Sequence, residues 1–258
     1  MPDVSIIVVS FNGREDLVRC LASLRDAPPA RSHEIIVVDN ASTDGSADAA
    51  RTFANVQVID AGRNTGFSVG NNIGIRASRG TNVLLLNNDT IVPPGAIDTL
   101  LAALDRHPDV AVVGPRIVDA DGRAELSFGD MVSPLGHVRQ KLAFRRAETV
   151  TRREQYPDWV TGACLLVRRT DADAAGLLDE RYFMYLEDVD FCAAIRARGR
   201  RILFTPAAEI THRRGRSFGS QASSSRAHRK SLVIFYEKHH PRWVPFVRLY
   251  LLLFHADT

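Results

Sequence analysis

Cysteine is scarce in this chain, and its three residues lie far apart. Cys20, Cys164 and Cys192 form no CxxC pair, and each falls within an apolar pattern. A disulfide framework or a structural zinc site needs several cysteines at short spacings. The pattern therefore favours buried thiols in a reducing compartment.

Long apolar runs are also absent. No run reaches about 20 apolar residues, the length that a helix needs to span a bilayer. The chain enters an apolar strand pattern at Val4, without the basic and then apolar segment of a secretory signal. We therefore expect a cytoplasmic protein, attached at most peripherally to the inner face of the plasma membrane.

Two common phosphate-binding loops, GxGxxG and GxxxxGK[ST], do not occur in the sequence. Instead, Gly62, Gly66, Gly70 and Gly74 recur every four residues. This spacing puts the later glycines on one face of a predicted helix. Either close packing of that helix or close approach to a ligand would explain it.

Net charge is only +3 for 258 residues, but it is unevenly placed. Residues 201–258 hold ten Lys or Arg against three acids, while the first 200 residues carry a net charge of −4. A basic tail favours an anionic partner such as phosphate, anionic lipid or nucleic acid, or it is a solvated face. No recognition motif supports nucleic acid.

Three apolar runs each end in a small polar cluster. The runs 4–9, 35–38 and 83–86 are followed by Ser10-Phe11-Asn12, Asp39-Asn40 and Asn87-Asn88-Asp89. Short runs of this kind are typical of buried parallel strands. Because ligands of open α/β sheets bind outside the carboxyl ends of the strands, the sequence predicts a polar ligand site there.

Strand and helix patterns alternate over the first 115 residues, which indicates an α/β fold with a parallel sheet. The region 120–158 loses this periodicity, and we expect it to be a long excursion near the site. The predicted strands cover 4–9, 34–38, 56–59, 82–86, 110–113, 160–167 and 201–204. The predicted helices cover 14–25, the segment from the turn 42–45 to about 53, 66–78, 94–106, 187–198, 226–240 and 242–254, with a Gly/Ser-rich loop over 217–225.

Three positions are candidates for metal or anion binding. Asp89 could hold a divalent cation if a substrate phosphate supplies further oxygens, or it could belong to a turn before Pro93. His212 could complete such a site if it lies near Asp89, although a lone histidine is more often structural. Arg63, in the loop before a predicted helix, could meet a phosphate.

Glu187, Asp188 and Asp190 open a predicted helix directly after the aromatic and apolar run 182–186. Acids are favoured in a first helical turn by capping and by the helix dipole, which would explain them without chemistry. Partial burial behind the aromatic run would instead raise a carboxyl pKa and suit it to general-base work. Trp159 precedes a small-residue turn and is either core or a platform for a sugar.

Taken together, these motifs resemble the family 2 inverting glycosyltransferases of the GT-A fold, and most closely their bacterial rhamnosyltransferase-like branch. The resemblance covers about residues 3–215. The matching segments, in order, are 4–12, 37–46, 63–67 with 71–74, 86–89, 159–163 and 185–190.

The resemblance implies a mixed, mainly parallel central sheet flanked by helices, with a C-terminal helical extension. It implies a glycosyltransferase domain over 1–215, with a donor half at 1–115 and an acceptor half at 116–215. Residues 216–258 would form a basic amphipathic helical tail. The segment 226–254 combines cations with large apolar residues, and it could lie on an anionic membrane surface or pack on the domain as a helical pair.

Roles follow for matching residues. The resemblance makes Asp188 the catalytic base, Asp89 and His212 the ligands of Mg²⁺ or Mn²⁺, and Trp159 and Glu187 acceptor-binding residues. The first acid of the usual DxD element is replaced by Asn87, which leaves one protein carboxylate there. Residues expected to bind the donor are Ser10, Phe11, Asn12, Asp39, Arg63, Asn64 and Asn88.

The implied reaction is metal-dependent and inverting. A sugar would move from a dTDP-, UDP- or GDP-linked donor to a hydroxyl of a glycan or polyprenyl-linked acceptor in cell-envelope polysaccharide synthesis. The resemblance to the rhamnosyltransferase-like branch implies that this sugar is rhamnose. Glu187 and Asp190 are rivals for the base, but adjacent side chains on a helix point about 100° apart, so we expect only one to face the donor.

Two other classes of protein stay open. A sugar nucleotidyltransferase would normally carry a glycine-rich phosphate loop near its N-terminus, where this chain has Ser10-Phe11-Asn12-Gly13. A non-catalytic nucleotide-sugar binding module is disfavoured by the retention of Asp89 and Asp188.

Overall fold

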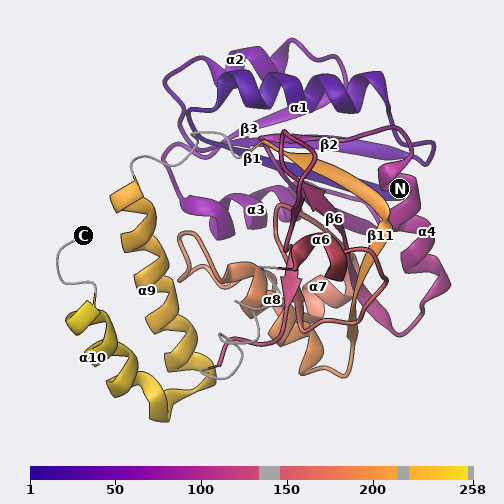
Figure 1. Ribbon diagram of the computed structural model, residues 1–258. Coiled ribbons are helices and arrows are strands. Elements are labelled where there is room, and N and C mark those ends of the chain that lie inside the picture. The colour runs from indigo at the N-terminus through magenta and orange to yellow at the C-terminus, as the bar shows by residue number, and fades with distance from the viewer. Residues whose placement is uncertain (134–145, 214–220, 255–258) are drawn as a thin grey trace.

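The computed structural model describes residues 1–133, 146–213 and 221–254. In this part of the chain, one large mixed sheet carries helices on both faces (Figure 1). Its strand order is β3-β2-β1-β4-β10-β6-β11-β5, and β7 pairs with β6. The strands are β1 (Val4–Ser10), β2 (His33–Asp39), β3 (Val56–Asp60), β4 (Asn82–Asn87), β5 (Thr90–Ile91), β6 (Val110–Val118), β7 (Ala124–Glu125), β10 (Cys164–Arg168) and β11 (Arg201–His212), with β8 (Phe128–Gly129) and β9 (Trp159–Val160) as a separate pair.

Two groups of helices cover the two faces of the sheet. Buried side chains of α1, α2 and α4 share one hydrophobic cluster, and those of α3, α7 and α8 share another. The helices are α1 (Arg14–Asp26), α2 (Ser46–Arg51), α3 (Gly66–Ala77), α4 (Ala96–Arg106), α6 (Ala147–Val150), α7 (Arg169–Ala175), α8 (Glu187–Arg196), α9 (Gln221–His239) and α10 (Val244–Phe254), with the short 3₁₀ helix η1 (Pro241–Trp243). No helix among the described residues is both long and apolar enough to cross a membrane.

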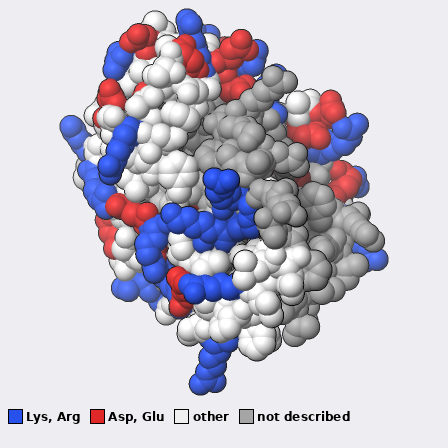
Figure 2. Space-filling model, turned by 90° about the vertical axis from the view of Figure 1, so that its left-hand side faces the viewer, with Lys and Arg blue, Asp and Glu red and all other residues white. Residues whose placement is uncertain are grey.

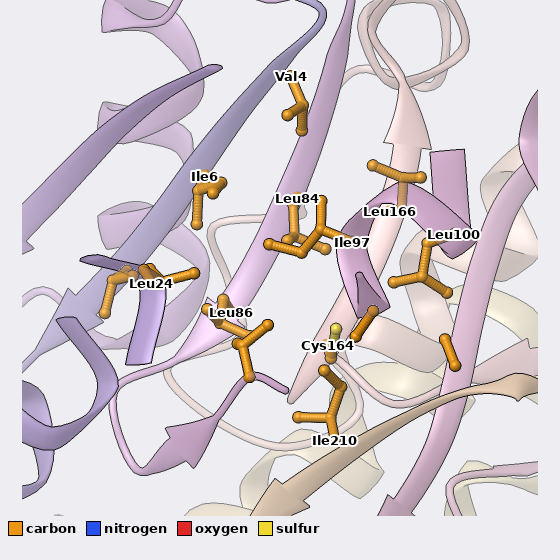
Figure 3. Close-up of a cluster of buried hydrophobic side chains, with 14 of the residues drawn as sticks. Val4, Ile6, Leu24, Leu84, Leu86, Ile97, Leu100, Cys164, Leu166 and Ile210 are labelled. Atoms are coloured by element: carbon orange, nitrogen blue, oxygen red, sulfur yellow. The ribbon is translucent and has the colours of Figure 1, made fainter. Parts of the chain in front are cut away.

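The strand β1 shows why its sequence is mostly apolar. Successive side chains of a strand point to opposite faces, so Val4 and Ile6 enter one cluster and Ile7 enters the other. Both faces of this central strand are covered, and polar residues would be buried on either. Figure 3 shows the first cluster, in which Leu84 of the sheet lies beside Ile97 of α4.

The parallel strands β1, β2 and β4 end at the same edge of the sheet. Ser10 at the end of β1 is paired in register with Asp39 at the end of β2, and Val9 is paired with Asn87 at the end of β4. The prediction that the polar clusters after these runs come together is therefore confirmed. The connections between these strands contain helices, which carry the chain back to the other edge of the sheet before the next parallel strand begins.

The glycines of α3 serve close packing. A Cβ at Gly70 would lie 2.8 Å from Cγ1 of Val9, and a Cβ at Gly74 would clash with Ile7. Of the two explanations for the four-residue spacing, packing of α3 against β1 is the one observed. At the start of the helix, Gly66 has a φ of 80°, and a Cβ there would collide with the carbonyl oxygen of Phe183.

Several sequence-based boundaries are wrong, and one of them is the strand expected over 110–113, which continues to Val118. The strand expected over 160–167 is interrupted at 161–163, where the backbone N–H of Thr161 turns aside to bond the carbonyl of Ser127. The strand expected over 201–204 continues to His212, because a register shift between Thr205 and Glu209 accommodates Pro206. The last long helix begins at Gln221 rather than 226, so part of the expected loop is helical.

The expected excursion over 120–158 contains short ordered elements, β7, β8 and α6, and its residues 134–145 lie outside the described residues. Residues 217–220 of the expected Gly/Ser-rich loop lie outside them as well. α9 packs against the body of the molecule, where Phe235 and Tyr236 join Tyr182 and Val189 in a third buried cluster. α9 and α10 stand together at one side of the molecule (Figure 1).

Candidate active site

A pocket of about 420 Å³ opens where β4 ends and α8 begins. It lies where the sequence predicts a polar ligand site, at the carboxyl end of β4. The pocket brings together segments that are about 100 residues apart along the chain. Its lining residues are Phe67, Asn87, Asn88, Asp89, Thr161, Gly162, Ala163, Met184, Tyr185, Leu186, Glu187, Asp188 and His212.

One wall of the pocket pairs Asp89 with His212. Oδ1 of Asp89, just beyond β4, lies 3.2 Å from Nε2 of His212, at the end of β11. Nδ1 of the same imidazole lies 3.5 Å from Oε2 of Glu125 on β7. Burial alone would lower the pKa of His212, but the hydrogen bonds to Asp89 and Glu125 outweigh burial and raise this pKa to about 9.

Asp89 and His212 fit a hard divalent cation whose other ligands come from a substrate. Mg²⁺ binds ligands at about 2.0–2.1 Å in octahedral geometry, which places neighbouring ligand atoms about 3 Å apart, close to the observed 3.2 Å. With its Nδ1 proton directed to Glu125, His212 would present Nε2 to a cation once the proton that Nε2 shares with Asp89 is displaced, a common arrangement at metal sites. Among the described residues no group of three His, Cys, Asp or Glu could hold a metal alone, so donor phosphate oxygens would complete the shell.

The ends of β1 and β2 form a polar group beside this wall. Nδ2 of Asn88 donates a hydrogen bond of 3.2 Å to Oγ of Ser10, which joins the group to the pocket. Oδ2 of Asp39 accepts the backbone N–H of Ser42, while its buried Oδ1 has no hydrogen-bond partner among the described residues. An unpartnered buried carboxylate oxygen costs free energy unless a ligand donor satisfies it, so Asp39 suits recognition of a nucleobase N–H.

The other predicted donor-binding residues lie around this group but do not line the pocket. Oδ1 of Asn12 accepts the backbone N–H of Thr43 at 2.8 Å, and Asn12 has a φ of 49°. Asn64 accepts the N–H of Gly66 at the start of α3. Phe11 is half-buried and Arg63 is exposed.

Trp159, expected to bind the acceptor, is not among the residues that line the pocket. Its ring packs at the junction of two buried clusters, and its Nε1 donates to the carbonyl of Asp130. The core interpretation of Trp159 is the one that these contacts support.

The opposite wall is made by the acids at the start of α8. Oδ2 of Asp188 accepts the N–H of Gly162 at 2.8 Å, and its Oδ1 accepts the N–H of Val189. Burial raises the pKa of Asp188, and these hydrogen bonds oppose that effect. Burial also raises the pKa of Glu187 well above its ordinary value, with the charge of Asp188 as the second cause, and Glu187 Oε2 has no partner among the described residues.

Both Glu187 and Asp188 line the pocket, and the expectation that only one of them faces the donor stays a prediction. Asp190 points away. Its carboxylate is 1% exposed and bonds Nζ of Lys238 at 2.8 Å and Nε2 of His239 at 2.7 Å, both on α9.

The segment 182–186 that leads into these acids is held from two sides. The carbonyl of Phe183 accepts the N–H of Phe67 from α3, and the carbonyl of Met184 accepts Oγ of Ser231 from α9. Tyr185 and Leu186 adopt left-handed φ values of 71° and 66°. Consecutive non-glycine residues in this region are strained, and such strain concentrates at functional sites.

Comparison with known proteins decides the family. The profile of Glycosyl transferase family 2 matches residues 5–173. The chain belongs to this family. This glycosyltransferase is also 34% identical over 268 residues to the N-acetylglucosaminyl-diphospho-decaprenol L-rhamnosyltransferase of Mycobacterium tuberculosis, a match that covers 94% of this chain and 87% of the relative.

Solved structures confirm the GT-A fold. The crystal structure of GalNAc-T7 with UDP, GalNAc and Mn²⁺ superposes with a TM-score of 0.69 at 18% identity, over 95% of this glycosyltransferase and 50% of that chain. The mannosyltransferase PcManGT from Pyrobaculum calidifontis, in complex with GDP-Man and Mn²⁺, gives a TM-score of 0.64 at 19% identity, over 99% and 70% of the two chains. The predicted family and fold are both confirmed.

Proposed function

We propose that this glycosyltransferase moves a hexose, L-rhamnose by its similarity to the mycobacterial enzyme, from a nucleoside diphosphate to a hydroxyl of a lipid-linked glycan, with inversion at the anomeric carbon. The observation that carries the proposal is one pocket with a cation-binding pair, Asp89 and His212, on one wall and two buried carboxyls, Glu187 and Asp188, on the other.

In this proposal the nucleoside lies against Ser10, Asn12 and Asp39, at the ends of β1 and β2. Asn88, bonded to Ser10, connects this subsite to the diphosphate position beside Asp89. A bound Mg²⁺ or Mn²⁺ would supply charge stabilisation for the diphosphate as it leaves. Arg63, exposed in the loop before α3, could reach the same phosphates from outside the pocket.

Asp188 accepts the proton of the acceptor hydroxyl as that oxygen attacks the anomeric carbon. Asp188 accepts the backbone N–H groups of Gly162 and Val189, which stabilise its charged form, whereas Oε2 of Glu187 has no partner among the described residues, so Asp188 is the acid that ionises. Protonated Glu187 can donate a hydrogen bond to a sugar hydroxyl, which fits its predicted role in acceptor binding. A single displacement without a carboxylate nucleophile inverts the anomeric configuration.

The name of the mycobacterial relative specifies a diphospho-decaprenol acceptor. A polyprenyl-linked acceptor of this class would place the reaction at the cytoplasmic face of the plasma membrane, in cell-envelope polysaccharide synthesis. It would also require the protein to work close to a lipid surface, which is compatible with peripheral contact through the basic tail.

Calorimetric titration of UDP, dTDP and GDP, each with and without Mn²⁺, tests the donor site. We expect one diphosphate to bind and its affinity to depend on the metal. The corresponding sugar nucleotide should then be consumed in the presence of a lipid-linked glycan, and proton NMR of the product should show the inverted anomer. Binding of none of the three diphosphates, or a retained anomer, would contradict the proposal.

A further inference from the structure

Helix α10 is apolar on both sides. Val244 and Val247 pack into the third buried cluster, against α9. On the other side, Phe246, Leu249 and Leu253 are between 53% and 67% exposed. Figure 1 shows α10 at the periphery, covered on one side by α9.

The exposed side chains form a continuous stripe. Residues 246, 249, 250 and 253 follow the spacing that places side chains on one face of a helix. Trp243 in η1 and Leu252 add to the same exposed apolar set, and the rings of Trp243 and Phe246 lie 5.7 Å apart. A surface helix in water normally has a polar outer face, so this stripe is typical of a helix that is covered by a partner.

The segment that carries the stripe is basic. Residues 221–254 contain six Lys or Arg and one acid, Glu237, which pairs with Arg248 at 2.7 Å. A second cation, Lys238, pairs with Asp179 and Asp190. Arg226, Lys230 and Arg242 are exposed. The side of the molecule that carries α9 and α10 faces the viewer in Figure 2, where Lys and Arg form a band across the middle with uncharged surface below it. This charge favours an anionic partner.

We propose that the outer face of α10 docks onto an anionic lipid bilayer. The helix lies along the interface with its apolar stripe among the upper acyl chains, and the exposed cations contact lipid phosphates. With 11 residues, α10 is about 16 Å long, about half of the hydrocarbon thickness, so it lies on the bilayer and does not cross it. The docking rests on the proposed function only in that a lipid-linked acceptor would be anchored in the same bilayer.

A second copy of the chain is a poorer occupant of this face. A twofold contact through α10 would place the cations of one copy beside those of the other. Glu237, the single acid of this region, is already engaged, so the like charges would be left without compensation. An anionic bilayer offers the opposite charge together with an apolar interior.

Docking of α10 would orient the pocket through α9. Oγ of Ser231 donates to the carbonyl of Met184, and the ring of His228 stacks on Tyr185 with centroids 5.7 Å apart. Both contacted residues line the pocket. The helix that carries the docking face is therefore packed on the helix that holds the acid-bearing wall.

Vesicle flotation of the full chain tests the docking. We expect the protein to float with phosphatidylglycerol-containing vesicles and to stay behind with phosphatidylcholine alone. The variant Phe246→Ser/Leu249→Ser/Leu253→Ser should reduce the bound fraction at least 10-fold, while the matched variant Phe246→Leu/Leu249→Ile/Leu253→Ile should float like the wild type. Circular dichroism and diphosphate binding, measured on all three proteins, show that each is folded.

Two results would overturn the docking. One is equal flotation of the serine variant and the wild type. The other is a wild-type dimer in light scattering that the serine substitutions convert to a monomer with no change in flotation, which would assign the face to a second copy. Flotation needs no nucleotide, so a protein that floats without binding any diphosphate contradicts the donor site alone, and one that transfers sugar without floating contradicts the docking alone.

Discussion

The two walls of the pocket differ in how their polar groups are satisfied. On one wall, Asp89, His212 and Glu125 follow one another at 3.2 Å and 3.5 Å, so each charged group has a partner of opposite character. On the other wall, Glu187 and Asp188 are both acids, and a Glu187 oxygen has no partner among the described residues. The first wall places a carboxylate beside an imidazole, which fits the proposed cation. In the second wall, burial raises both carboxyl pKa values, which suits proton transfer.

Asp188→Asn is expected to give the largest effect, because it removes the proton acceptor without changing the size of the side chain. We expect kcat to fall by about 10²–10⁴-fold, the usual contribution of a general base. Donor binding, measured by calorimetry, should stay nearly unchanged.

The matched variant for this wall is Glu187→Gln. Since Glu187 holds its proton in the proposed mechanism, an uncharged amide replaces an uncharged acid, and we expect less than about a 10-fold loss of kcat. If Glu187→Gln instead abolished transfer and Asp188→Asn kept it, the two roles would have to be exchanged.

Asp89→Ala tests the first wall. It removes the one carboxylate of the cation-binding pair, and we expect the Mn²⁺-dependent part of diphosphate binding to be lost, a decrease of about 100-fold in affinity. The metal-independent part, which depends on Asp39 and Ser10, should persist. If Mn²⁺ still increased the affinity for the diphosphate in Asp89→Ala, the metal would bind elsewhere than at Asp89.

The sequence predicts the strand ends beside the first wall better than it predicts the contacts within that wall. Val9, Ser10, Asp39 and Asn87 sit at the ends of continuous apolar runs, and the parallel register that aligns them follows from those runs alone. Local pattern is sufficient here because a strand covered on both faces leaves few alternatives.

The contacts that the sequence does not predict join residues that lie far apart along the chain. Glu125 belongs to a two-residue strand in a region without periodicity, and its approach to His212 depends on the pairing of β7 with β6. The pairing of Asp190 with Lys238 and His239 joins segments almost 50 residues apart, and no spacing rule connects them. Only knowledge that β7 pairs with β6 would have indicated that Glu125 lies near His212.

Glu125→Gln tests whether the carboxylate next to His212 strengthens metal binding at the first wall. The amide oxygen can still accept the Nδ1 proton of His212, but without the negative charge that orients the imidazole and increases its basicity. We expect about a 10-fold weaker affinity for Mn²⁺, measured by calorimetry in the presence of the diphosphate. Glu15→Gln, at an exposed position of α1, is the control and should leave this affinity unchanged.

The second wall should make the stability depend on pH. The pKa of Glu187 is higher in the folded protein than its ordinary value of 4.5, so its contribution to stability is complete below that value and is lost as pH rises through the folded pKa. Glu187→Gln does not ionise. Its free energy of unfolding in urea should therefore increase relative to that of the wild type as pH rises above 4.5 and through the folded pKa. A constant difference between the two proteins across this pH range would show that Glu187 does not titrate as described.

Ser231→Ala is expected to give the smallest effect, and it tests whether α9 supports the second wall. It removes the 2.7 Å hydrogen bond to the carbonyl of Met184, which should cost about 1 kcal/mol of stability. Thr99→Ala removes another hydroxyl-to-carbonyl bond, the exposed local one from Thr99 to Gly95 at the start of α4, away from the pocket. If the α9 contact positions the acids, kcat falls about 2–5-fold in Ser231→Ala and stays constant in Thr99→Ala. If the two variants lost similar stability and had equal kcat values, α9 would only support the structure. A lower kcat in Ser231→Ala alone is expected only if the contact of α9 positions the wall that holds the proton acceptor, Asp188.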